Sequence, residues 1–145
     1  MADESGNEVR AAQNDVVEEF AFFDDWMDRY QYLIDLGRRL PALADEELVE
    51  ENKIKGCQSQ VWLVASQDNG RLQFKAISDA AIVSGLIAIL LRIYSDRRPQ
   101  DILDTPADFV SELKLDQHLS PTRSNGLAAM LAAIRRFATE AQQAA

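Results

Sequence analysis

The chain has 145 residues, of which 47% are hydrophobic, and this length and composition predict a globular domain with its own core. Its net charge of −9, from 15 basic and 24 acidic residues, disfavours a nucleic-acid partner, because nucleic-acid binders carry a basic face. The first residues are acidic and polar, unlike a signal peptide, and no apolar stretch reaches the roughly 20 residues that a membrane span needs. We therefore expect a cytoplasmic protein with no membrane partner.

Residues 1–10 are predicted to form a flexible polar tail, and residues 11–145 a single domain. Between residues 16 and 40, apolar side chains recur at intervals of three and four, which predicts two amphipathic helices. The Asp24-Asp25 pair could cap the second of these helices. Residues 42–52 are rich in acidic side chains and predict a connector to the next part of the chain.

A β-hairpin is the clearest strand element in the sequence. Val61 to Ala65 is rich in β-forming residues, Asp68-Asn69-Gly70 is a turn signal, and residues 72–77 alternate between apolar and polar side chains. Lys53-Ile54-Lys55 predicts a further strand, with Gly56-Cys57 at the bend that follows it. Together these segments predict a small three-stranded antiparallel sheet.

The segment after the hairpin, Ala80 to about Tyr94, is apolar nearly all round, and this predicts a buried central helix. Either Ser78 or Asp79 could cap it by accepting a hydrogen bond from one of its free N–H groups.

Prolines predict where the remaining helices begin, because proline has no N–H group to lose in the first turn. Pro99 and Pro106 each suit the first position of a short helix, with Thr105 as the cap of the second, and Ser120-Pro121 repeats the arrangement before the last helix. The last helix carries an inward apolar stripe made of Leu127, Met130, Leu131, Ile134 and Phe137. The order of helices, small antiparallel sheet and helices predicts an α+β domain, with helices packed on the sheet.

Cys57 is the only cysteine of the chain, so it has no intrachain disulfide partner and cannot join a multi-thiolate metal site. Its thiol is the strongest candidate nucleophile in the sequence. Gly56 permits a tight turn beside it, Lys53 and Lys55 could favour the thiolate, and the polar run 58–60 favours an accessible site. The alternative, an inert buried cysteine, stays open on these observations.

Other chemistry has little support in the sequence. There is no glycine-rich phosphate loop, and with one cysteine and one histidine a metal site would need carboxylates for its other ligands. Cys57 and His118 could form the nucleophilic pair of a hydrolase if the fold brought them together beside an oxyanion hole. Otherwise His118 is a surface or helix-end residue. We expect no metal and no cofactor of the protein's own.

Several blocks of the sequence carry a resemblance to a known family. The longest, in chain order, are IKGCQSQVWL, SDAAIVSGLIAIL and QHLSPTRSNGLAAM, and the shorter segments LIDLGRRLPAL and PQDI fit as well. The spacing of the blocks also matches, and the match covers about residues 15–140. The chain resembles the SufE/CsdE family of sulfur-acceptor proteins, and the resemblance implies a fold like that of the IscU scaffold proteins.

The resemblance also implies a function that the spacing of residues does not give. Members of this family bind a pyridoxal-phosphate-dependent cysteine desulfurase, of the SufS or CsdA type, and take persulfide sulfur from it onto their own cysteine. They stimulate the desulfurase and pass the sulfur on to a cluster scaffold, for iron–sulfur cluster assembly, or to another acceptor. Cys57 falls on the acceptor position. We therefore expect a sulfur-transfer accessory protein rather than an enzyme, with the pyridoxal phosphate held by the partner.

Other residues in the matching blocks are expected to support Cys57 or to bind the partner. Arg123 either places a positive charge near the thiol or is an ordinary surface arginine, and Asp79 either lines the cysteine site or simply caps the central helix. The residues of this supporting group are Gly56, Gln58, Ser59, Asp79, His118 and Arg123.

Because a persulfide is reactive, we hypothesise that the turn at Cys57 shelters it until a partner docks. Two alternatives to the carrier are kept: a cysteine hydrolase that uses Cys57 and His118, and a non-covalent adaptor in which Cys57 is inert.

Overall fold

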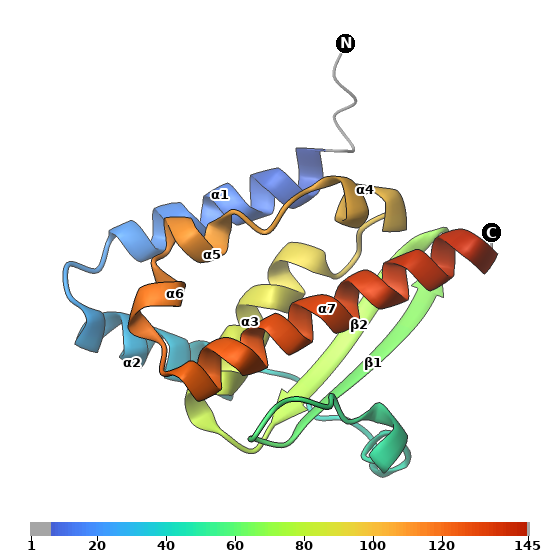
Figure 1. Cartoon of the computed structure of the whole chain (residues 1–145), viewed down its shortest axis with the longest axis horizontal. Helices are drawn as coiled ribbons and strands as arrows, with labels where there is room; N and C mark the ends of the chain where they lie inside the picture. The colour runs from blue at the N-terminus through green and yellow to red at the C-terminus, as the bar shows by residue number, and fades with distance from the viewer. Residues whose placement is uncertain (1–6, 145) are drawn as a thin grey trace.

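Residues 7–144 are described by a computed structural model. In chain order the elements are α1 (Asn7–Ala21), α2 (Trp26–Arg38), the 3-10 turns η2 (Asp45–Glu47) and η3 (Glu50–Asn52), β1 (Val61–Asp68), β2 (Arg71–Ser78), α3 (Ala81–Tyr94), α4 (Pro99–Asp104), α5 (Phe109–Glu112), α6 (Leu115–His118) and α7 (Pro121–Ala144). Helix α7 runs across the molecule, with the hairpin on one side and α1, α4, α5 and α6 on the other (Figure 1). The α+β class that the sequence predicts is therefore confirmed.

The hairpin forms where the alternating pattern places it. β1 and β2 pair antiparallel along their whole length, with Val61 opposite Ser78. Asn69-Gly70 joins them with φ angles of 55° and 78°, left-handed values that suit an Asn-Gly turn. Leu63 and Phe74 are buried on the face of the hairpin that meets the helices, so this face forms one wall of the core.

The third predicted strand is not formed, because the sheet in residues 7–144 is two-stranded. Lys53–Lys55 contributes only an isolated antiparallel bridge between Lys53 and Trp62. Lys53 directly follows η3, and Gly56 turns the chain away with a φ of 91°. The segment between them is too short to build a ladder, so it lies at the sheet edge and places Cys57 just before the start of β1.

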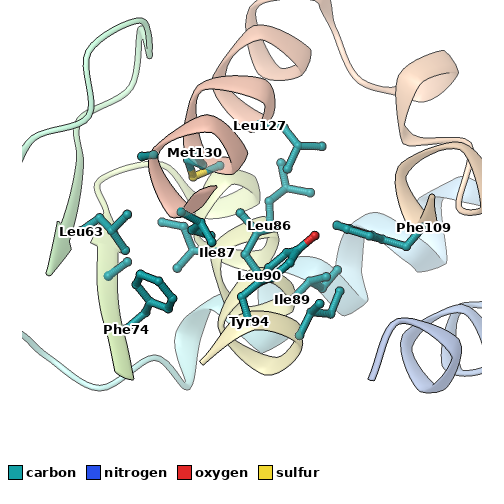
Figure 2. Close-up of a cluster of buried hydrophobic side chains, with 14 of the residues drawn as sticks. Leu63, Phe74, Leu86, Ile87, Ile89, Leu90, Tyr94, Phe109, Leu127 and Met130 are labelled. Carbon is teal, nitrogen blue, oxygen red and sulfur yellow. The ribbon is translucent and has the colours of Figure 1, made fainter. Parts of the chain in front are cut away.

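The core is organised around α3, the central helix that the sequence predicts. Figure 2 shows its side chains lying between the hairpin and Phe109 of α5, with Leu127 and Met130 of α7 above them. The buried residues labelled there are Leu63, Phe74, Leu86, Ile87, Ile89, Leu90, Tyr94, Phe109, Leu127 and Met130. On another side α3 meets α2 so closely that a Cβ on Gly85 would lie 2.1 Å from the carbonyl oxygen of Leu33. A glycine is therefore required at position 85.

The predicted caps of α2 and α3 have different outcomes. Asp25 caps α2 as predicted, because its carboxylate accepts a hydrogen bond from the N–H of Asp28 at 2.9 Å. The prediction of a Ser78 or Asp79 cap for α3 is wrong: the residue before the helix is Ala80, and no side chain caps it. The Asp79 carboxylate instead accepts a hydrogen bond from the N–H of Gln60, just before β1.

Two of the predicted helix starts are confirmed. Pro99 is the first residue of α4, and Pro121 is the first residue of α7. Ser120 caps α7 as predicted, its hydroxyl accepting a hydrogen bond from the N–H of Arg123 at 3.3 Å.

The predicted start at Thr105-Pro106 is wrong, because α5 begins only at Phe109. The hydroxyl of Thr105 is buried and donates to the carbonyl oxygen of Asp101 at 2.8 Å. It therefore closes the end of α4 instead of opening the next helix.

The predicted polar tail needs a correction at its inner end. Residues 1–6 lie outside the described residues, but residues 7–10 belong to α1. Val9 is fully buried, and Arg10 forms an ion pair with Asp108 at 3.1 Å. The acidic connector 42–52 contains η2 and η3. Among residues 7–144, no helix is both long enough and apolar enough to cross a membrane.

Candidate functional site: Cys57 beside helix α7

Cys57 lies in the turn between the Lys53 bridge and β1, against the N-terminal part of α7. Gly56 precedes it with a φ of 91°, a left-handed value that glycine adopts without the strain that a side chain would bring. The Cys57 side chain is half-buried, and its thiol donates a weak hydrogen bond to the carbonyl oxygen of Gly126 at 3.6 Å. The turn thus points the thiol inward, toward a helix 69 residues further along the chain.

A small pocket surrounds the thiol. Its lining residues come from the Cys57 turn, from α3 and from α7: Cys57, Gln58, Ser59, Val83, Thr122, Arg123, Gly126, Leu127 and Met130. The cavity volume is about 20 Å³, which is room for roughly one water-sized group. Its inner wall is apolar, because Val83, Leu127 and Met130 are buried. The pocket therefore has room for about one small group beside the thiol.

Burial raises the pKa of the Cys57 thiol, because a thiolate loses hydration in this half-apolar setting. The expectation that nearby lysines favour the thiolate is not supported. The Lys53 ammonium forms an ion pair with Glu50 at 3.2 Å and lies over the Trp62 ring, and Lys55 is exposed outside the pocket. The thiol is therefore protonated at neutral pH in this conformation.

Arg123 does lie at the cysteine site, as one of the two sequence alternatives proposed. It stands in the first turn of α7, is exposed, and lines the pocket. Its guanidinium has no ion-pair or hydrogen-bond partner among residues 7–144 that would hold it elsewhere. A positive charge is therefore available at the mouth of the pocket.

Asp79 plays a different part from either alternative, since it neither caps α3 nor lines the pocket. Its carboxylate accepts from the N–H of Gln60 at 3.0 Å, and its own N–H donates to the carbonyl oxygen of Gln60 at 3.3 Å. This pair of bonds fixes the main chain three residues after Cys57. Gln58 and Ser59, which lie between the two points, line the pocket as members of the same loop.

The fold does not bring Cys57 and His118 together. His118 is exposed at the end of α6, and its ring stacks on Trp26 with 4.0 Å between the ring centroids. Its carbonyl oxygen accepts a hydrogen bond from the Tyr30 hydroxyl. His118 is not among the residues that line the Cys57 pocket. Within the described chain there is also no group of three or more His, Cys, Asp or Glu side chains placed to hold a metal ion.

Several pocket residues were not identified as site residues from the sequence. Val83, Thr122 and Gly126 carry no chemical signal of their own, and Leu127 and Met130 were identified only as part of the inward stripe of α7. The one available signal was Gly126, a glycine inside a helical pattern, which usually has a packing or functional reason.

A second groove adjoins the site beside α7. It is lined by Glu51, Lys53, Ile54, Lys55, Ala129, Ala132, Ala133 and Arg136, and we call it the basic groove. It borders the Cys57 turn, since a Cβ on Gly56 would lie 3.6 Å from that of Ala129. Lys55 and Arg136 are exposed there, in a protein whose net charge is −9.

The chain is similar to known proteins over most of its length. The family model SufE, described as an Fe-S metabolism associated domain, matches residues 14–138. An uncharacterized SufE-like protein of Rhizobium etli is 44% identical over 133 residues, covering 88% of this chain and 90% of the relative. A second uncharacterized SufE-like protein, from Rhizobium meliloti, is 43% identical over 132 residues, covering 88% and 92%.

A solved structure shares the fold. The solution structure of a hypothetical protein from Thermus thermophilus superposes with a TM-score of 0.75 at 20% identity, covering 91% of this chain and 96% of that one. Fold and site together define a small α+β domain with one cysteine presented on a turn. The chain belongs to the SufE family, which is associated with iron–sulfur metabolism.

Proposed function

We propose that this protein is a sulfur carrier that takes persulfide sulfur from a cysteine desulfurase onto Cys57, stimulates the desulfurase and passes the sulfur on. The observation that carries the proposal is the setting of the thiol. The chain's only cysteine is half-buried on a turn, beside a pocket of about 20 Å³ that has room for roughly one further atom. This setting suits a carrier, which adds one sulfur atom to Cys57, better than a hydrolase, which needs room for a substrate.

The proposed step is a substitution at sulfur, of the same kind as thiol–disulfide exchange. The Cys57 thiolate attacks the outer sulfur of the persulfide on the desulfurase cysteine. A bond forms between the Cys57 Sγ and that sulfur, and the S–S bond of the donor breaks. The Cys57 sulfur is oxidised by one unit and the donor sulfur is reduced by one, so no outside oxidant is needed. The donor leaves as a thiolate, and the outer sulfur keeps its proton.

Docking of the partner is proposed to activate the thiol. Burial raises the pKa of Cys57, so the free protein holds few thiolates at neutral pH. Moving the turn away from α7 would break the bond from Cys57 to Gly126 and rehydrate the sulfur, which would favour the thiolate. The free protein would thus be protected against oxidation and become reactive only in the complex.

The partner is proposed to be a desulfurase of the SufS or CsdA type, which would hold the pyridoxal phosphate. The basic groove beside the turn suits an acidic segment of that partner by charge complementarity, since Lys55 and Arg136 are exposed in it. The downstream acceptor is a cluster scaffold or a related sulfur-receiving protein. We place the protein in the cytoplasm, where its single thiol stays reduced.

The hydrolase alternative loses its support, because the stacked His118 lies outside the pocket that holds Cys57. One variant distinguishes the adaptor alternative from the carrier. Cys57→Ser should still bind the desulfurase with unchanged affinity but should abolish both sulfur delivery and the stimulation of cysteine turnover that depends on it. Binding by calorimetry and alanine production by the desulfurase measure the two effects. Full stimulation by Cys57→Ser would favour the adaptor and contradict the carrier.

A further inference from the structure

Gly126 has a property that the other glycines packed inside helices lack. A Cβ added to Gly85 or Gly37 would collide with backbone atoms at 2.1 Å and 2.8 Å, so packing requires glycine there. Beyond its own helix, a Cβ added to Gly126 would have only one described atom within 4 Å, and that atom is the Cys57 Sγ at 3.6 Å. Packing of the fold therefore permits alanine at position 126.

Glycine at this position also weakens the helix. Gly126 lies inside α7, a helix of 24 residues, and is buried. A glycine in a helix interior destabilises it by comparison with alanine, because glycine loses more backbone freedom on folding. A residue that lowers stability without a packing reason points to a role in the site it faces, which here is the Cys57 pocket.

A side chain at position 126 would occupy the space next to the Cys57 thiol. A methyl group 3.6 Å from Sγ is already in van der Waals contact with the thiol, so the thiol form tolerates it. In a persulfide, the outer sulfur lies about 2.05 Å from Sγ. An outer sulfur directed into the pocket toward α7 would overlap that methyl group. With alanine at position 126 the outer sulfur would have to point toward solvent.

We propose that Gly126 is a specificity-determining residue that leaves the space for the outer sulfur of a Cys57 persulfide. The inference rests on the proposed function and adds to it where the carried sulfur sits: against Gly126, over the buried Leu127 and Met130. There it is shielded from small thiols. The pocket thus has the size of one sulfur atom added to Cys57. It has this size because Gly126 has no side chain to fill it.

The test loads the sulfur without a desulfurase, so that it does not depend on the partner. Wild type, Gly126→Ala and the matched control Asn125→Ala, an exposed position in the same helical turn, are treated with sodium polysulfide and desalted. Intact-protein mass spectrometry then follows loss of the added sulfur from Cys57 in glutathione. Urea unfolding of each unloaded variant measures stability.

We expect Gly126→Ala to be at least as stable as wild type, yet to lose its outer sulfur roughly fourfold faster, the factor for losing the burial of one methylene-sized group. Asn125→Ala should keep the wild-type lifetime. Equal lifetimes for wild type and Gly126→Ala would overturn the inference, and so would a Gly126→Ala variant less stable than wild type. If the lifetimes differ but no desulfurase loads the wild type, the space for sulfur stands and the proposed donor fails.

Discussion

Asp79 holds the main chain of Gln60 from both sides. Its carboxylate accepts from the Gln60 N–H at 3.0 Å, and its own N–H donates to the Gln60 carbonyl at 3.3 Å. Gln60 closes the turn that carries Cys57, and the thiol at the other end of that turn is tied to Gly126. Residues 57–60 of the turn are therefore held by these few contacts, and opening this part of the turn requires that they break.

Loosening this attachment should expose the thiol. In Asp79→Ala the side-chain acceptor is lost and the N–H of Gln60 is left to water, so the turn opens more often. We expect alkylation of Cys57 by iodoacetamide to be several-fold faster than in wild type, with little change in global stability. Asp68→Ala, at the exposed end of β1, is the matched control. A rate identical to wild type would show that Asp79 does not restrain the turn.

Gly56 should be intolerant of a side chain. Its φ of 91° is reached by residues with a Cβ only at a cost of about 1–2 kcal/mol. Gly56→Ala should lower the free energy of unfolding by about that amount, or shift the turn and with it Cys57. Urea unfolding monitored by circular dichroism gives the value, with Lys55→Ala as the neighbouring control. An unchanged midpoint together with an unchanged thiol reactivity would contradict the assigned backbone conformation.

The raised pKa of Cys57 has a consequence for stability at high pH. Because burial raises the folded pKa above the unfolded one, the stability linked to this proton is fully present below the unfolded pKa and is lost as the pH rises through the folded pKa. We expect the free energy of unfolding of wild type to fall relative to that of Cys57→Ser above about pH 8.5, the value of an unfolded thiol.

Tyrosines complicate the absolute curves but not this difference. Burial raises the pKa of Tyr94 to about 12, and burial and Glu19 raise the pKa of Tyr32. Both tyrosines therefore also lower the stability at high pH, and they do so equally in wild type and in Cys57→Ser. Subtracting the two stability curves isolates Cys57. Parallel curves between about pH 7 and pH 10, the range around the ordinary thiol pKa, would mean that the thiol is not shielded.

The basic groove should contribute to desulfurase affinity through charge. Lys55→Glu and Arg136→Glu should each weaken binding by roughly two- to fivefold, the range for an exposed charge pair, and the effect should shrink as salt is added. Lys114→Glu changes charge equally at the exposed junction of α5 and α6, outside the groove, and serves as the control. Equal losses in all three variants would assign the effect to net charge alone.

The elements that sequence predicts well are those whose signal is local. Asn69-Gly70 sets the hairpin turn, Asp25 caps α2, and the apolar run of α3 marks the central helix, because each depends on neighbours along the chain. The turn at Gly56-Cys57 is predictable for the same reason. Lys53–Lys55 looks like a strand locally, but only the fold decides whether a partner strand runs beside it for long enough.

The site was predictable only in part, because its wall comes from distant segments. Cys57 and Arg123 were identified from the sequence. Gly126 lies 69 residues after Cys57, and no local sequence pattern predicts the contact between them. His118 and Trp26 stack on each other, and this keeps the only histidine out of the cysteine site. Asp79 resembled a helix cap in sequence because a carboxylate beside a helix start is often one. Here the N–H of Gln60, the residue before β1, donates to that carboxylate instead.

Intact-protein mass spectrometry is the direct test of sulfur transfer to Cys57. Wild type and Cys57→Ser are each incubated with a cysteine desulfurase and free cysteine, then desalted and weighed with and without reductant. We expect wild type to gain the mass of a single sulfur atom, reductant to remove it, and Cys57→Ser to gain nothing. An unmodified wild-type mass with every desulfurase that binds the protein, while its thiol remains free to react, would contradict the role of Cys57 as a sulfur carrier.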